Sequence, residues 1–149
     1  MNKARHLTVA TQQGDYALER QVGFLLREAT QRHTAIFARL MPDEVTPTQW
    51  AALARLSELG PCSQNLLGRR TAMDAATIKG VVDRLIARGL AQARPDARDQ
   101  RRRAIALTEA GDAFVGQALA RARQITEETL QPLDAAERAQ LLRLLAKIK

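Results

Sequence analysis

The stretch that decides the fold reads RPDARDQRRRAIALTEAG and spans residues 94 to 111. Its polar, arginine-rich part separates two short alternating segments, Leu90 to Arg94 and Arg103 to Leu107. Short alternating segments on either side of a polar turn are typical of a β-hairpin, and Ile105 and Leu107 would share one of its faces. The stretch therefore predicts a hairpin whose tip carries several positive charges.

The positive charge of the chain is concentrated around this hairpin. Lys and Arg outnumber Asp and Glu by ten to four over residues 63 to 103, against seven to six over residues 1 to 62 and six to six over residues 104 to 149. A basic segment between neutral ones concentrates potential where a polyanion would dock. Nucleic acid is the first partner that this pattern indicates.

Two short helices are predicted directly before the hairpin. Ser63 would cap a helix from Gln64 to about Arg70, and Asp74 would cap a second from Ala75 to Arg88, which Gly89 ends. Two helices joined by a tight turn form a helix-turn-helix. The second helix would bury a stripe made of Ile78, Val81, Val82, Leu85 and Ile86, and its outer face would carry Thr77, Lys79, Gly80, Asp83 and Arg84.

Helices are predicted on both sides of this unit. The first predicted helix runs from about Asp15 to Leu40. The second runs from Pro47 to Leu59; the sequence Thr46-Pro47-Thr48-Gln49 caps its start, and Gly60-Pro61 ends it. Thr108 would begin a helix that lasts until Pro132, and a capping box of Asp134 and Glu137 would begin the last. The apolar stripes are Leu18, Val22, Leu25, Leu26, Ala29, Ile36, Phe37 and Leu40 in the first helix, Phe114, Val115, Ala118, Leu119, Ala122 and Ile125 after Thr108, and Leu141, Leu142, Leu144, Leu145 and Ile148 at the end.

Composition restricts the class of protein. With 149 residues, of which 46% are hydrophobic, the chain suits one domain. No apolar run is long enough to span a bilayer, and residues 1 to 6 are not followed by the apolar segment of a secretory signal. A cytoplasmic protein is therefore expected. One cysteine and two histidines predict neither a disulfide framework nor a metal site. There is no Gly-rich phosphate loop, nucleophile motif or recognisable carboxylate pair, so neither an enzyme nor a cofactor is expected.

A helix-turn-helix followed by a two-stranded wing is a winged helix, a mainly α fold, and over residues 16 to 147 the chain resembles the MarR family of bacterial transcription regulators. The resemblance is carried by residues 96 to 101 with Leu-Thr-x-x-Gly at 107 to 111, by Asp83-Arg84-Leu85 and by Arg88-Gly89-Leu90. It implies a homodimer on a pseudo-palindromic operator, with a ligand cleft between dimer region and DNA lobe. Residues 1–149 would form one domain, with dimerisation helices at 15–41 and 108–149 and a DNA-binding lobe at 47–107.

The expected DNA contacts lie on the helix-turn-helix and on the wing. Side chains at the start of a recognition helix reach base edges in the major groove, and a wing arginine suits a narrow minor groove. The resemblance implies that Asp99 pairs with Arg101 and fixes its direction. The expected contacts are Thr77 and Lys79 near bases, Arg84 at phosphate, Ser63, Gln64, Asn65, Arg69 and Arg70 along the backbone, and Arg98, Asp99, Arg101 and Arg102 at the wing. Each could instead be a solvated surface residue. Ala75-Ala76 and Gly80 depart from the family pattern.

Three further residues suggest how DNA binding could be regulated. His33 interrupts the apolar stripe of the first predicted helix, Arg20 lies on the same helix, and Trp50 lies at the start of the next. Together these side chains could bind a small aromatic carboxylate, although His33 and Trp50 could equally well be packed core residues. Overall similarity within the family is to repressors of aromatic-acid catabolism, including nicotinate-degradation regulators. Two other readings stay open: a thiol-responsive repressor acting through Cys62, and a non-specific architectural DNA-binding protein.

Overall fold

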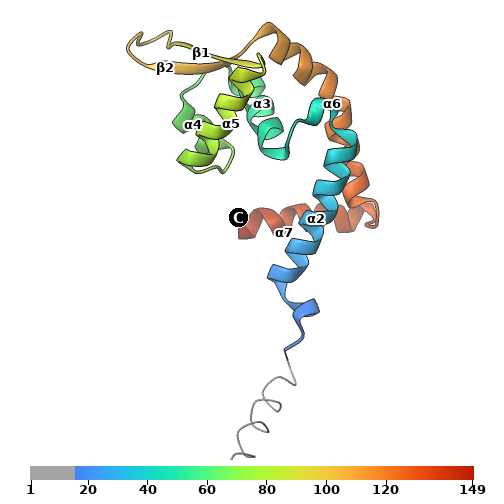
Figure 1. Ribbon diagram of the computed structural model, residues 1–149. Helices are drawn as coiled ribbons and strands as arrows, with labels where there is room; N and C mark the ends of the chain where they lie inside the picture. Colours follow the sequence, from blue (N-terminus) through green and yellow to red (C-terminus); the bar gives the residue numbers. More distant parts are fainter. Residues whose placement is uncertain (1–15) are drawn as a thin grey trace, which may run out of the picture.

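The computed structural model describes residues 16–149. Residues 42–107 form a part that we call the head, and the helices before and after it in the chain form a part that we call the stalk (Figure 1). In chain order the elements are η1 (Leu18–Arg20), α2 (Val22–Leu40), η2 (Pro42–Glu44), α3 (Pro47–Leu59), α4 (Gln64–Arg70), α5 (Ala75–Ala87), β1 (Ala91–Pro95), β2 (Arg103–Leu107), α6 (Glu109–Leu130) and α7 (Ala135–Ile148). The expected mainly α fold with a hairpin wing is confirmed.

The helix starts follow the capping residues that the sequence offers. Thr46 with Gln49, and Asp134 with Glu137, form complete capping boxes, while the side chains of Ser63, Asp74 and Thr108 each accept a backbone N–H of the first turn. Each cap satisfies backbone donors that a helix otherwise leaves free. The glycines expected to stop α3 and α5, Gly60 and Gly89, both have φ +72°, which L residues rarely adopt.

Four sequence predictions need correction. The first helix begins at Val22, because Gln21 has extended backbone angles and a separate 3-10 turn precedes it; the predicted start at Asp15 lies outside the described residues. Strand β1 covers 91–95, one residue later than predicted, and α5 ends at Ala87 with Arg88 as its C-cap. Ile86 is 38% exposed, since it lies at the edge of the buried stripe of α5.

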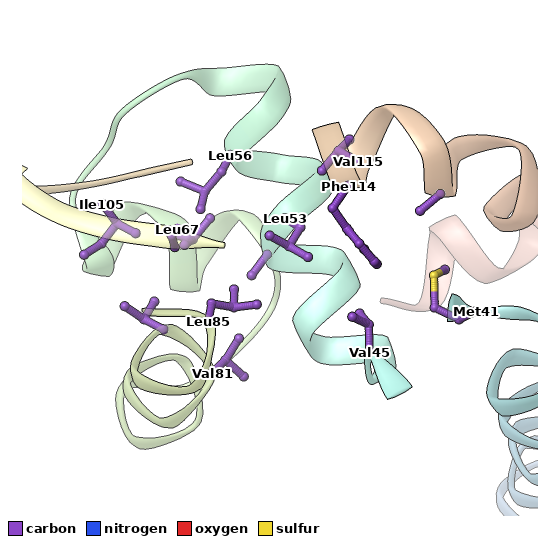
Figure 2. Packing of buried hydrophobic residues seen from close by; sticks show 14 of the residues in the cluster. Met41, Val45, Leu53, Leu56, Leu67, Val81, Leu85, Ile105, Phe114 and Val115 are labelled. Carbon is purple, nitrogen blue, oxygen red and sulfur yellow. The ribbon is translucent and has the colours of Figure 1, made fainter. Parts of the chain in front are cut away.

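The core of the head lies between α3 and its neighbours. Figure 2 shows Leu53 and Leu56 of α3 with Leu85 of α5 on one side and Phe114 and Val115 of α6 on the other. Leu53 and Leu85 have no exposed surface, so α3, α5 and α6 share one apolar centre. This shared centre fixes the orientation of α5, whose opposite face is left to solvent.

The wing is attached to the head by a short set of backbone contacts. Antiparallel β1 and β2 pair from Ala91 with Leu107 to Pro95 with Arg103, and Ile105 in the middle of β2 also forms an isolated bridge with Cys62. The Thr108 hydroxyl donates to Gly89 O at 2.6 Å, and Thr108 N donates to Leu90 O at 3.2 Å. The wing root is therefore hydrogen-bonded to the end of α5, and Figure 1 shows the hairpin extending away from the head.

The stalk leaves much apolar surface uncovered in the protomer. No residue of α7 is buried, and α2 buries only Ile36 and Phe37. We call the exposed large apolar side chains of η1, α2 and α7 the uncovered apolar surface: Leu18, Val22, Leu25, Leu26, Leu142, Leu144, Leu145 and Ile148. Apolar patches of this kind on a water-soluble protein mark interaction sites. In the described part of the chain no helix is long and apolar enough to cross a membrane.

Candidate nucleic-acid interface

The exposed face of α5 carries the residues expected to read bases. Thr77, Lys79 and Arg84 are all exposed, whereas Ile78, Val81 and Val82 between them are buried. Lys79 forms an ion pair with Asp83 one turn later, with Nζ 2.6 Å from Oδ2. Because both side chains are more than half exposed, this pair contributes little to stability and leaves Lys79 able to exchange partners.

Helix α4 supplies a second set of exposed polar residues. Asn65, Arg69 and Arg70 are exposed and Gln64 is half-buried, while Ser63 caps the helix through Leu66 N at 3.2 Å. The two helices pack closely because Gly68 has no side chain: a Cβ there would lie 3.1 Å from Ile78 Cγ2 and 3.2 Å from Met73 O. This close packing holds α5 against α4 in a fixed orientation.

The wing turn is ordered by two aspartates. Asp96 Oδ1 accepts the backbone N–H groups of Arg98 at 2.8 Å and Asp99 at 3.2 Å. These hydrogen bonds, reinforced by the neighbouring positive charges of Arg98 and Arg102, hold the pKa of the Asp96 carboxyl below its usual range. Asp96 therefore stays ionised at neutral pH, and its carboxylate holds the backbone of the turn through these two hydrogen bonds.

The expected pairing of Asp99 with the Arg101 side chain is wrong in the protomer. Asp99 Oδ1 accepts the backbone N–H of Arg101 at 3.0 Å, and its other oxygen lies 3.6 Å from Nε of Arg102. A carboxylate in a tight turn reaches the backbone N–H two residues later more easily than the tip of a long side chain. Asp99 thus fixes where the Arg101 side chain leaves the turn, and its charge is shared with Arg102.

A groove of about 850 Å³ brings several of these residues together. It lies between the wing and the start of α4, and Ser63, Arg98, Asp99 and Arg102 all line it. Arg94 and Arg103, which sequence reasoning left out of the DNA-contacting set, line it too; their place in the basic segment was the available signal. The groove presents four arginines on one side of the head, an arrangement that suits a phosphate backbone.

Cys62 also lines this groove and is only 7% exposed. Burial raises the pKa of its thiol, and its backbone is fixed to Ile105 by hydrogen bonds of 3.0 and 2.7 Å. A thiol with a raised pKa forms little of the thiolate that reacts with oxidants. These properties favour a structural residue over a redox sensor.

Within one protomer, Arg20 lies far from His33, the second of the three candidate ligand residues. Arg20 is exposed in η1 and lies roughly 20 Å from His33 along the direction of α2, given the rise of a helix. Trp50 is half-buried in α3 and packs on the core of the head. A single small acid therefore cannot touch Arg20 and His33 of the same chain.

His33 has a defined hydrogen-bond geometry. Its Nδ1 lies 2.9 Å from Thr129 Oγ1, and the Thr129 hydroxyl is also 2.7 Å from Ile125 O. A hydroxyl has one proton, and if it donates that proton to the carbonyl it must accept from His33. Nδ1 then carries a proton, and Nε2 is left for another partner. Sequence reasoning found His33 but not Thr129, which lies far away along the chain.

Three arginines make contacts that the sequence did not indicate, two within the stalk and one between α5 and the segment before α3. Glu128 of α6 forms an ion pair with Arg39 of α2, which lowers the pKa of Glu128, and Arg32 donates to its backbone oxygen at 2.8 Å. Arg88, at the end of α5, donates to Asp43 O at 2.6 Å and to Gln49 Oε1 at 3.3 Å.

The Arg88 contact connects α5 with the segment that joins stalk and head. That segment is η2, where Asp43 and Glu44 have φ of 55° and 52°, a backbone region that non-glycine residues seldom occupy. Gln49, the acceptor on α3, is 6% exposed and also completes the cap of that helix. A movement of the stalk relative to the head would therefore act directly on the end of α5.

Comparison with known proteins gives a consistent result. A model described as the MarR family matches residues 44–102. The transcriptional repressor NicR of Pseudomonas putida is 46% identical over 89% of this chain and 85% of its own. A crystal structure of a Pseudomonas aeruginosa protein is 53% identical with a TM-score of 0.87, covering 89% of this chain and all of its own. BpsR of Bordetella bronchiseptica, whose DNA binding is regulated by 6-hydroxynicotinic acid, is 40% identical with a TM-score of 0.85, covering 91% and 97%.

Proposed function

Because the chain belongs to the MarR family of transcription regulators, we propose that it is a homodimeric, sequence-specific repressor that a small aromatic carboxylate releases from its operator. The observation that carries this proposal is the arrangement of the head, which presents the polar face of α5 and an ordered arginine wing. We assign DNA binding to residues 47–107 and dimerisation to 15–41 and 108–149, all within one domain, and no enzymatic activity.

A second copy of the chain is the natural partner for the uncovered apolar surface. Leu26 of α2 and Leu142, Leu145 and Ile148 of α7 line one apolar groove, so residues far apart in sequence form a continuous surface. A helix that buries nothing in its own protomer gains most of its stability by packing against another chain. Twofold symmetry would present two α5 helices to half-sites about one helical turn apart, which predicts a pseudo-palindromic operator.

Two arginines are expected to contribute to DNA binding in different ways. Arg101→Ala should weaken specific binding by about 1–3 kcal/mol per subunit, whereas Arg84→Ala should weaken all sequences alike and reduce the salt slope by about one unit per subunit. The reason is that groove contacts discriminate between sequences and phosphate contacts do not. Fluorescence anisotropy over a series of salt concentrations measures both. Unchanged operator affinity of Arg101→Ala at fixed salt would show that the wing assignment is wrong.

The proposed effector site uses the Nε2 edge of His33 and the ring of Trp50. Nε2 of His33 would hydrogen-bond a polar group of the acid, and the indole of Trp50 would suit its aromatic ring. Since Arg20 lies too far along its own chain, we propose that the second copy brings its Arg20 to this site. BpsR, which is 40% identical to this chain and whose DNA binding is regulated by 6-hydroxynicotinic acid, makes a pyridine carboxylate the first candidate.

The effector proposal can be tested with 6-hydroxynicotinic, nicotinic and benzoic acids. The chain has one tryptophan, so tryptophan fluorescence reports on Trp50 alone. We expect an acid that quenches Trp50 to lower operator affinity about tenfold, which requires ~1.4 kcal/mol of preference for the form that does not bind DNA. Nicotinamide, which lacks the carboxylate, is the matched control and should do neither. The proposal fails if no acid that quenches Trp50 also releases DNA.

The alternatives give different results in the same experiments. An architectural DNA-binding protein would bind an unrelated duplex as tightly as the operator and would ignore the acids. A thiol switch would require Cys62→Ser to abolish a response to peroxide, although the buried thiol and its raised pKa disfavour such a response. Footprinting on duplexes selected from a random library separates the first alternative from the repressor.

A further inference from the structure

Gly80 stands in the middle of the recognition helix α5, and the protomer itself gives no reason for a glycine there. Glycine destabilises a helix interior relative to alanine, because the free chain loses more conformational entropy on folding. The backbone at Gly80 is not in the left-handed region, and an added Cβ would meet only Arg84 Nη1, at 3.8 Å. That distance is an ordinary contact with the far end of a flexible side chain.

The other glycine of the helix-turn-helix behaves differently. A Cβ on Gly68 would lie 3.1 Å from Ile78 Cγ2 and 3.2 Å from the Met73 carbonyl oxygen, so the packing of α4 on α5 explains that residue. Nothing comparable surrounds Gly80. If the folded protomer does not need Gly80, the reason lies in something that approaches α5 from outside.

The surroundings of Gly80 indicate what that is. The residues one turn before and after it on the same face, Thr77 and Arg84, are exposed, and so is Ala76. Neither Gly80 nor Ala76 carries a long side chain, so at the half-buried Gly80 only the flexible tip of Arg84 lies beside the backbone of α5. A base-pair edge in the major groove fits such a notch, and the C5 methyl of thymine is its protruding apolar part.

We propose that Gly80 lets α5 sit close to the floor of the major groove, with a thymine methyl against its Cα, and that it is a determinant of operator specificity. This inference rests on the proposed function, since it requires that α5 enters DNA. Alanine at position 80 would strengthen the helix and at the same time hold it away from the base pairs. Stability and specific DNA binding would therefore change in opposite directions.

The test compares Gly80→Ala with wild type on duplexes that the wild-type protein selects from a random library. We expect the Tm to rise by about 2–8 °C, affinity for the selected duplex to fall about tenfold, and affinity for an unrelated duplex of equal length to stay the same. Replacing one half-site thymine by uracil, which lacks the methyl, should weaken wild type and have less effect on the variant. Gly116→Ala in α6 is the matched control for helix stability, because a Cβ there meets nothing within 4 Å in the protomer. It should raise the Tm by a similar amount, which separates the effect of helix propensity from the effect on DNA.

Each other outcome is decisive. Unchanged affinity of Gly80→Ala for the selected duplex, or a lowered Tm, would overturn the role assigned to Gly80 while leaving the repressor proposal intact. Equal effects of uracil on wild type and variant would overturn the thymine contact. A wild-type protein that selects no sequence at all would instead refute the proposed function, and the inference with it.

Discussion

Replacing Gly111 by alanine is expected to destabilise the protein by about 3 kcal/mol, the upper range for forcing an extra group into a packed interior. A Cβ at this position would lie 2.0 Å from the Leu90 carbonyl oxygen and 3.0 Å from the Leu90 carbonyl carbon. Both are backbone atoms, so no side-chain rotation can relieve the clash. Either α6 or the root of the wing must move by an ångström or more.

The measurement is thermal or urea unfolding of Gly111→Ala beside Gly116→Ala. Both variants change glycine to alanine in α6, so helix propensity predicts the same gain, up to about 1 kcal/mol, for each. The difference between the two isolates the contact with Leu90. Equal stability of the two variants would mean that the wing root is not packed against α6 as described.

This joint explains why two sequence motifs occur together. Gly89 ends α5 with a positive φ, Leu90 offers its carbonyl, and Thr108 bonds to both residues while it caps α6 through Gly111 N at 3.0 Å. The Arg-Gly-Leu and Leu-Thr-x-x-Gly motifs are therefore the two halves of one contact between recognition helix, wing and stalk. The sequence shows both motifs, but their contact becomes visible only in the fold.

The helices were predictable where local signals decide their ends. Thr46, Ser63, Asp74 and Asp134 each bond to the backbone three residues later, a purely local interaction that the sequence reveals. The start of the first helix could not be predicted in this way, because the helical spacing of its apolar residues continues across Gln21, where the backbone is extended. Periodicity records which face is apolar and not whether the helix is continuous.

The contacts of the candidate sites could be predicted only where the residues involved are close together in the sequence. The wing arginines lie within one turn, so the sequence located them, although the partner of Asp99 depends on backbone geometry that the pattern does not carry. His33 contacts Thr129 and Arg88 contacts Asp43 across 96 and 45 positions of the chain, and such distant contacts leave no sequence signal. The effector site is harder still, because Arg20 and His33 of one protomer are far apart.

The second large effect is expected from Leu145→Asp in α7. Leu145 is 37% exposed in the protomer and lines the groove with Leu26 and Leu142, which we assign to the dimer interface. In a twofold dimer the change is made twice, and each carboxylate would be buried without a partner at a cost of several kcal/mol. We expect a folded monomer at micromolar concentration where wild type is a dimer.

The loss of the dimer should be seen in DNA binding as well. A dimer that holds one half-site keeps its second α5 at a millimolar effective concentration near the other, and a monomer loses this advantage of about 10²–10⁴-fold. Analytical ultracentrifugation measures the dimer, circular dichroism confirms that the helices persist, and anisotropy measures operator affinity. Gln140→Asp, which places the same charge at an exposed polar position of α7, should change none of the three. A Leu145→Asp protein that still sediments as a dimer would remove the interface from α7, because a buried and unpaired pair of charges cannot be tolerated there.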